Sequence, residues 1–194
     1  MTTHDGTEVE IKFLVRDAQA LERSLESAGF HQQTPSTLEA NTLYDNATGA
    51  LRRAGEVLRL RIYGDRCLLT HKSPGAAVAL KHKTRIEHET AVASVEQMHA
   101  ILTALGFRAA FRYEKFRAEW SDGEGEVVID RTPIGDLAEI EGAPQWIDRI
   151  AMVLGLSEND YITASYAELF FGWKERTGSA ALHMTFEQCG TPRP

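Results

Sequence analysis

Charged and apolar residues alternate in the stretch Glu8-Val9-Glu10-Ile11-Lys12-Phe13, which continues into Leu14-Val15. Successive side chains of a β-strand point to opposite faces of the sheet, so this stretch predicts a strand with one ionic and one apolar face. Similar alternation returns at residues 58–62, 68–72, 81–89, 113–117, 127–130 and 138–141. We therefore predict a protein rich in β-strands, most of which carry a charged face.

Three segments show a helical period instead of a period of two. Apolar residues recur every three or four positions along residues 17–29, 94–106 and 144–155. Gly29 is a natural stop for the first helix, and Ser94 is a natural N-cap for the second. Periodicity is lost after about residue 177. We therefore expect a folded domain, residues 1–175, and a C-terminal tail, residues 176–194, that is disordered or a tag-like extension.

The charged faces are hard to explain on a flat sheet. Each strand taken alone fits a half-exposed sheet whose charged face meets water. Three strands, however, carry pairs of carboxylates that would repel without compensation, namely Glu8/Glu10, Glu87/Glu89 and Glu139/Glu141. A sheet of about eight strands that curls into a barrel brings such faces together around room for a small ligand. The predicted fold class is therefore α+β, a closed β-barrel with helices packed on its apolar outside.

An interior lined by carboxylates and bases is expensive to remove from water unless something pairs the charges. Divalent cations suit the carboxylates, because Mg²⁺ prefers oxygen ligands and commonly bridges carboxylates to phosphate oxygens. A polyanion suits the bases, because Arg and Lys bind phosphate as bidentate forks and as point charges. The pattern predicts a metal–polyphosphate site with Mg²⁺ as the cofactor and Mn²⁺ as the alternative.

Composition narrows the classes of partner. The chain has 194 residues and a formal net charge of −7, which argues against a nucleic-acid partner. No apolar stretch approaches the roughly 20 residues needed to cross a bilayer, and Met1–Ile11 lacks the pattern of a signal peptide. Cys67 and Cys189 follow no metal-ligand or redox spacing. We expect a cytoplasmic protein with no membrane partner.

Several charged motifs follow one another in a fixed order. They are Glu8-Val9-Glu10-Ile11-Lys12, Leu51 to Arg61, Thr70-His71-Lys72, Lys83 to Glu89, Glu114 to Arg117, Glu139-Ile140-Glu141 and Ser165-Tyr166. The first matches an ExExK signature, and the ordered set, over roughly residues 7 to 172, resembles the CYTH superfamily. This superfamily comprises the triphosphate tunnel metalloenzymes, among them thiamine triphosphatases, inorganic triphosphatases and class IV adenylyl cyclases.

The resemblance implies an eight-stranded antiparallel tunnel with helices outside, and it favours a homodimer. The metal ligands that it implies are Glu8, Glu10, Glu139 and Glu141, with Asp130, Glu87 and Glu89 as further candidates. The phosphate ligands that it implies are Lys12, Arg59, Arg61, Lys72, Lys83, Arg85, Lys115 and Arg117. The expected catalytic residues are Lys12, Arg59 and Arg61, which stabilise developing charge, and Glu87, which activates the nucleophile unless a second metal does so.

Three functions remain open. The first is hydrolysis of a small triphosphate substrate, either inorganic triphosphate or thiamine triphosphate, and the second is cyclisation of ATP to cyclic AMP and pyrophosphate. The third is a polyphosphate-binding module without catalysis, which is least favoured because all the metal carboxylates are present. Characterised class IV cyclases resemble one another in a His-Phe pair ahead of ExExK, and Thr2 to Thr7 contains no such pair. Hydrolysis is therefore the expected reaction.

Overall fold

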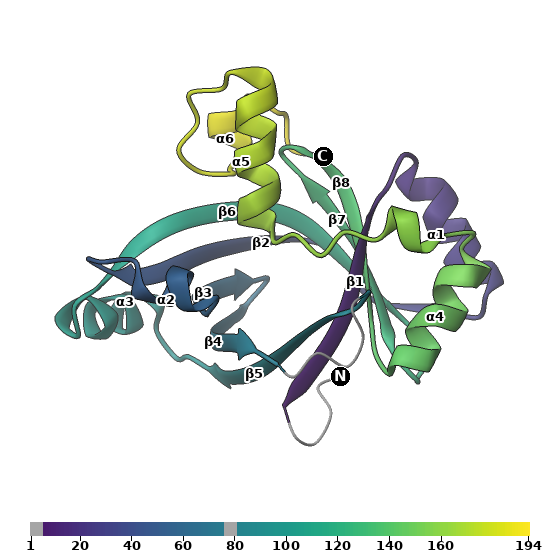
Figure 1. Ribbon diagram of the computed structural model, residues 1–194, viewed down its shortest axis with the longest axis horizontal. Coiled ribbons are helices and arrows are strands. Elements are labelled where there is room, and N and C mark those ends of the chain that lie inside the picture. The colour runs from purple at the N-terminus through teal and green to yellow at the C-terminus, as the bar shows by residue number, and fades with distance from the viewer. Residues whose placement is uncertain (1–5, 76–80) are drawn as a thin grey trace.

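The computed structural model describes residues 6–75 and 81–194, and its eight antiparallel strands close into a barrel (Figure 1). The predicted fold class is confirmed. The strands are β1 (Thr7–Leu14), β2 (His31–Asn46), β3 (Val57–Tyr63), β4 (Arg66–Pro74), β5 (Lys83–Ala91), β6 (Phe107–Ser121), β7 (Glu126–Thr132) and β8 (Gly135–Glu141). The helices are α1 (Ala18–Ser27), α2 (Ala50–Ala54), α3 (Val95–Ala104), α4 (Pro144–Val153), α5 (Tyr166–Thr177) and α6 (Phe186–Cys189), with a 3-10 turn at Glu158–Asp160.

The first strand closes the barrel. The strand order around it is β1-β5-β4-β3-β2-β6-β7-β8, so β1 pairs with β5 on one side and with β8 on the other. Glu10 is the register partner of Lys83 on β5 and of Glu141 on β8. Because neighbouring strands are in register here, their charged side chains share the inner face of the barrel.

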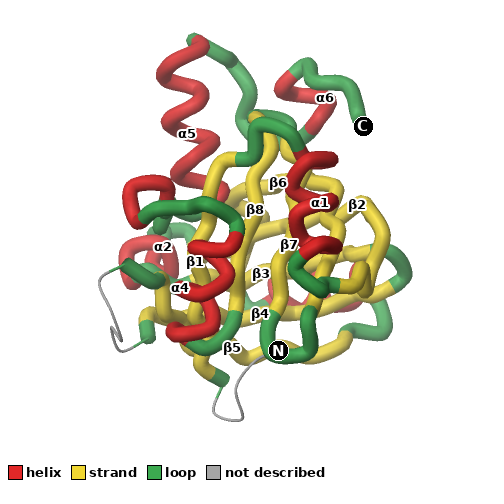
Figure 2. Tube along the Cα trace, turned by 90° about the vertical axis from the view of Figure 1, so that its right-hand side faces the viewer, coloured by secondary structure: helices red, strands yellow, loops and turns green. Residues whose placement is uncertain are grey.

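The outward side chains of the strands pack under the helices. Figure 2 shows α1 and α4 on the same side of the barrel. There Ile11 and Ile140 of the strands form one buried cluster with Leu25 of α1 and Ile147 of α4. The three helices predicted from periodicity are confirmed, and Ser94 caps α3 by accepting a hydrogen bond from the Gln97 amide. The helices therefore cover the apolar outside and leave the ionic face inside.

The C-terminal segment differs from the expectation of an unstructured tail. Helix α5 stands beside β6 (Figure 1), and the residues after it return to the barrel. The Met184 amide donates to the Arg112 carbonyl, the Glu114 amide donates to the Met184 carbonyl, and Met184 and Phe186 are buried. This segment binds to the edge of β6, and its few apolar residues are too irregularly spaced to reveal that packing. Among the described residues, no helix is both long and apolar enough to span a bilayer.

Candidate active site

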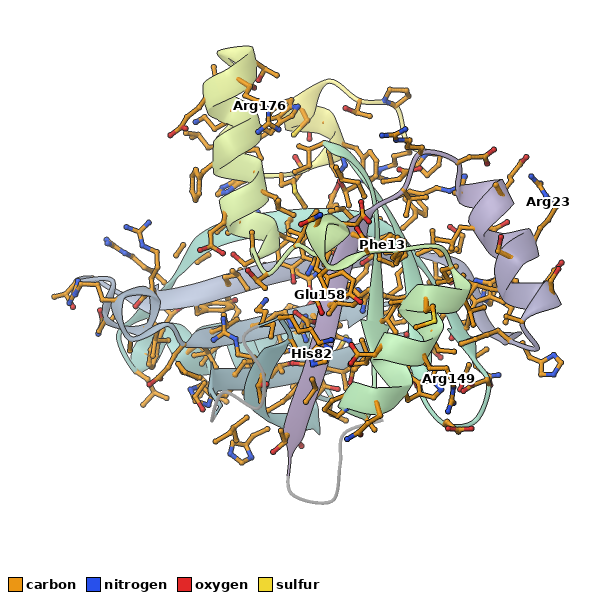
Figure 3. All side chains as sticks on the ribbon, turned by 45° about the vertical axis from the view of Figure 1, so that its right-hand side comes forward. Phe13, Arg23, His82, Arg149, Glu158 and Arg176 are labelled. Atoms are coloured by element: carbon orange, nitrogen blue, oxygen red, sulfur yellow. The ribbon has the colours of Figure 1, made fainter. Side chains whose placement is uncertain are left out.

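The barrel encloses a cavity of about 760 Å³ lined by side chains from all eight strands and from the starts of α2 and α5. Of the site residues predicted from the sequence, all but Asp130 line this cavity. By contrast, Arg23, Arg149 and Arg176, labelled in Figure 3, are exposed on the helices outside. The alternation of the strands thus separates the bases of the motifs from the ordinary surface bases.

Four carboxylates lie together where β1 meets β8; we call Glu8, Glu10, Glu139 and Glu141 the carboxylate quartet. Burial raises the pKa of Glu141 to about 7, and the nearby charge of Glu8 adds to the effect. Burial also raises the pKa of Glu8. For Glu10 and Glu139 burial acts in the same direction, but neighbouring bases, Lys12 foremost, together outweigh it and lower the pKa of both. The surroundings therefore disfavour the charge of Glu8 and Glu141 and favour that of Glu10 and Glu139.

The chemistry of the quartet fits a hard divalent cation, because clustered carboxylate oxygens are the ligands that Mg²⁺ prefers. Within the described part of the chain, no three His, Cys, Asp or Glu side chains already stand in a metal-binding arrangement. Lysines instead hold three members of the quartet. The Lys72 ammonium lies 2.6 Å from Glu8, Lys83 lies 3.0 Å from Glu10, and Lys12 lies 2.7 Å from Glu139. A cation bound to the quartet would release these lysines.

The predicted phosphate-binding bases face the same cavity, and in the described ranges all but Arg85, which donates to the Gly55 carbonyl, are paired with carboxylates. Lys72 also lies 2.8 Å from Glu87, and the guanidinium groups of Arg59 and Arg61 lie within 4 Å of Glu89. Burial disfavours the charge on Lys12, yet Glu139 and Glu10 outweigh it and raise the pKa of this lysine. Lys12 therefore stays cationic, and a polyphosphate is the kind of ligand that would exchange with the carboxylate partners of these bases.

Asp130 lies on the inner face, as predicted, but the structure gives it a different environment from the quartet. It is 0% exposed, and protein donors occupy both of its oxygens. Arg117 Nε donates to Oδ1 at 2.7 Å, Lys115 Nζ donates to Oδ2 at 3.1 Å, and the Tyr166 hydroxyl also donates to Oδ2. Tyr166 at the start of α5 covers this carboxylate, which the strand pattern alone does not reveal. We assign Asp130 as the counter-ion of two bases and not as an accessible metal ligand.

Two further residues of the site, Tyr166 and Glu39, were not predicted from the sequence. The Tyr166 ring stacks on Tyr113 with centroids 5.6 Å apart, and the ammonium groups of Lys12 and Lys115 lie 4.9 and 4.6 Å from its centroid. Such cation–π contacts fix the direction of both lysines. Glu39 lies on β2, is fully buried and contacts Lys115 and Arg117. Polar residues at every second position before Tyr44, namely Glu39 and Asn41, were the available signal.

The raised pKa of Glu141 predicts a pH-dependent stability. Its ordinary value of 4.5 holds in the unfolded chain, whereas burial raises it to about 7 in the folded protein. The contribution of Glu141 to stability is therefore fully present below about pH 4.5 and is lost as the pH rises through 7. In the presence of a chelator, we expect the free energy of unfolding to fall between pH 5 and pH 8. Urea denaturation across this range measures it.

The matched variant for this experiment is Glu141→Gln, which cannot ionise. Its free energy of unfolding should vary less with pH than that of the wild type over the same range. Parallel pH dependences of the two proteins would show that Glu141 does not titrate near neutrality.

Comparisons with known proteins agree with this geometry. A family described as the CYTH domain matches residues 6–166 of the chain. No curated protein sequence matches the chain.

Solved structures share the fold. A protein from Vibrio parahaemolyticus, proposed to be an adenylate cyclase, is 21% identical, with a TM-score of 0.77 over 87% of this chain and 99% of that one. A protein from Pyrococcus horikoshii is 22% identical, with a TM-score of 0.71 over 84% and 98%. A proposed adenylyl cyclase from Hippeastrum, described as having a dominant triphosphatase activity, is 20% identical, with a TM-score of 0.61 over 85% and 95%. At these identities the similarity establishes the architecture alone.

Proposed function

The chain belongs to the CYTH domain family, and from that premise we propose that it is a divalent-metal-dependent enzyme that hydrolyses a phosphoanhydride bond of inorganic triphosphate or thiamine triphosphate. The observation that carries this proposal is the shared cavity, in which the carboxylate quartet and eight bases face one another. Triphosphatase activity is also the dominant activity described for the Hippeastrum protein of the same fold.

The bases have the clearest role in this reaction. Lys12, Arg59, Arg61, Lys72, Lys83, Arg85, Lys115 and Arg117 would bind the phosphate oxygens and stabilise the charge that develops on the leaving group. The quartet would hold Mg²⁺, or Mn²⁺ in its place. When bound, the cation supplies neutralisation of the phosphate oxygens and polarisation of the bond to be broken.

Glu87 is the proposed acceptor of the proton from the attacking water. Burial acts to raise its pKa, but Lys72 at 2.8 Å, together with Arg59 and Arg61, outweighs burial, and the pKa is lowered. The carboxylate is therefore ionised and can take up a proton as the water oxygen attacks the terminal phosphorus. The bridging oxygen then leaves with the remaining diphosphate.

A second candidate is cyclisation of ATP, the reaction proposed for the Vibrio protein. The cavity supports an organic group on the substrate, because part of its lining is apolar, namely Leu43, Leu51, Phe111 and Phe171 of β2, α2, β6 and α5. A planar base or ring would pack there. Residues 2–5, which belong to the stretch that lacks a His-Phe pair, lie outside the described residues.

A turnover assay tests the proposal. Tripolyphosphate, thiamine triphosphate and ATP are supplied in parallel with Mg²⁺ or Mn²⁺, and orthophosphate, pyrophosphate and cyclic AMP are resolved. We expect metal-dependent release of orthophosphate from tripolyphosphate or thiamine triphosphate. Cyclic AMP with pyrophosphate from ATP would establish the cyclase instead. No turnover of any substrate with either metal would leave a polyphosphate-binding module and remove the catalytic roles.

A further inference from the structure

Glu39 is a buried carboxylate that the proposed reaction does not use. It lies on the inner face of β2 as the register partner of Lys115, is 0% exposed, and does not line the cavity. Its Oε1 atom is 3.5 Å from Lys115 Nζ, and its Oε2 atom is 3.9 Å from Arg117 Nε. Asn41 Nδ2 donates to Oε1 at 2.9 Å. Glu39 therefore contacts two of the bases, Lys115 and Arg117, without lining the cavity itself.

The surroundings of Glu39 are cationic, unlike those of the quartet. Burial works against its charge, but Lys115, Arg117, Arg61 and Arg59 together outweigh burial and hold its pKa well below the usual range. Among the described residues, its Oε2 atom has no hydrogen-bond partner. A buried carboxylate with an unsatisfied oxygen is costly for folding, since a well-packed apolar residue in its place is often neutral or stabilising. Its position therefore points to a role in the site.

We propose that Glu39 is a built-in counter-charge that lowers the affinity of the tunnel for polyphosphate and so allows the anionic products to leave. The inference rests on the proposed function, because it requires that Lys115 and Arg117 bind phosphate. A phosphate in contact with these bases lies within roughly 6–7 Å of the Glu39 carboxylate, the sum of one base contact on each side. At that distance one unit charge changes the affinity for a polyanion by about tenfold or more in a partly buried site.

Removal of this charge has two linked consequences. Without Glu39, the four bases repel one another in the free protein, so the free protein is less stable. A bound polyphosphate relieves the same repulsion, so its binding is tighter. This combination distinguishes a counter-charge from a residue that merely supports the fold, whose loss weakens binding together with stability.

The experiment measures binding of tripolyphosphate by titration calorimetry in the presence of a chelator, which prevents turnover. Glu39→Gln keeps the size of the side chain and removes its charge, and we expect its Kd to fall about tenfold. Glu39→Asp keeps the charge and should stay within about twofold of the wild type. Glu124→Gln removes an exposed carboxylate outside the cavity, and its Kd should also stay within about twofold of the wild type.

Thermal unfolding over a range of tripolyphosphate concentrations gives a second measurement, which also serves if Glu39→Gln folds only with ligand present. The midpoint of Glu39→Gln should be lower than that of the wild type without ligand and should rise more steeply with ligand. An equal or weaker affinity of Glu39→Gln, with normal binding by the wild type, overturns the counter-charge and leaves the proposed function intact. Absence of binding by the wild type overturns both.

Discussion

Replacement of Glu8 and Glu10 together by Gln is expected to reduce metal-dependent triphosphate turnover at least about a thousandfold. Both residues belong to the first strand and supply half of the carboxylate quartet. Gln preserves the size of each side chain and its hydrogen-bonding capacity but loses the charge that binds a divalent cation. A thousandfold loss of rate corresponds to about 4 kcal/mol of transition-state stabilisation, which is the scale expected for a metal site. Steady-state turnover with saturating Mg²⁺ measures the effect.

The controls separate the metal site from the phosphate site. The double variant also frees Lys72 and Lys83, which the two carboxylates hold in the wild type. Its affinity for tripolyphosphate in the presence of a chelator should therefore be equal to or higher than that of the wild type. Glu124→Gln should turn over substrate at the wild-type rate. Wild-type turnover by the double variant would remove the quartet from the proposed metal site.

Asp130→Asn is expected to lower the free energy of unfolding by about 3–5 kcal/mol, because it leaves the buried charges of Lys115 and Arg117 without their main partner. Asp130 is 0% exposed, so water cannot replace the lost charge. For a chain of this length the midpoint of thermal unfolding should fall by roughly 10 °C. Urea denaturation and thermal unfolding, both measured in the presence of a chelator, report the two quantities.

Tyr166→Phe is the matched control for Asp130→Asn. It removes one hydrogen bond to the same carboxylate and keeps the ring stacked on Tyr113, so it should cost only about 1.5–3 kcal/mol. A contrary outcome is equally informative. If Asp130→Asn has nearly wild-type stability but binds Mg²⁺ about tenfold more weakly, Asp130 is a metal ligand, as the sequence predicted, and its assignment as a counter-ion is wrong.

The fold was largely predictable because most strands of this barrel have two chemically distinct faces. Alternation identified seven strands, and the pairing of like charges made a closed interior the consistent solution. Strand β2 was not predicted because residues His31 to Thr37 are exposed or half-buried and show no regular alternation. Helix α5 was not predicted because the exposed Phe171 places an aromatic residue off the face that Tyr166, Phe170 and Trp173 share, which obscures the helical period.

The sequence predicted which residues face the inside of the barrel, but not which of them are accessible from the cavity. The parity of each strand placed Glu10, Arg59 and Glu139 on the inner face, where the structure has them. Parity does not say which inward side chain another element covers. Asp130 and Glu139 both point inward, yet Tyr166 from a distant helix covers only Asp130. Such differences depend on contacts between segments far apart in the chain, which a local pattern does not contain.

The position of β1 in the barrel has a consequence for how the protein folds. Glu10 is made early in synthesis, but its register partners, Lys83 and Glu141, follow more than 70 and 130 residues later. Pairings of such long sequence separation form slowly, since the entropy of closing the loop must be lost before the contact forms. The two halves of the quartet meet only where β1 pairs with β8, so a chain without this pairing has no assembled quartet. A cation that binds the quartet binds only chains in which β1 and β8 are paired. Its binding therefore shifts the population toward the closed barrel by mass action.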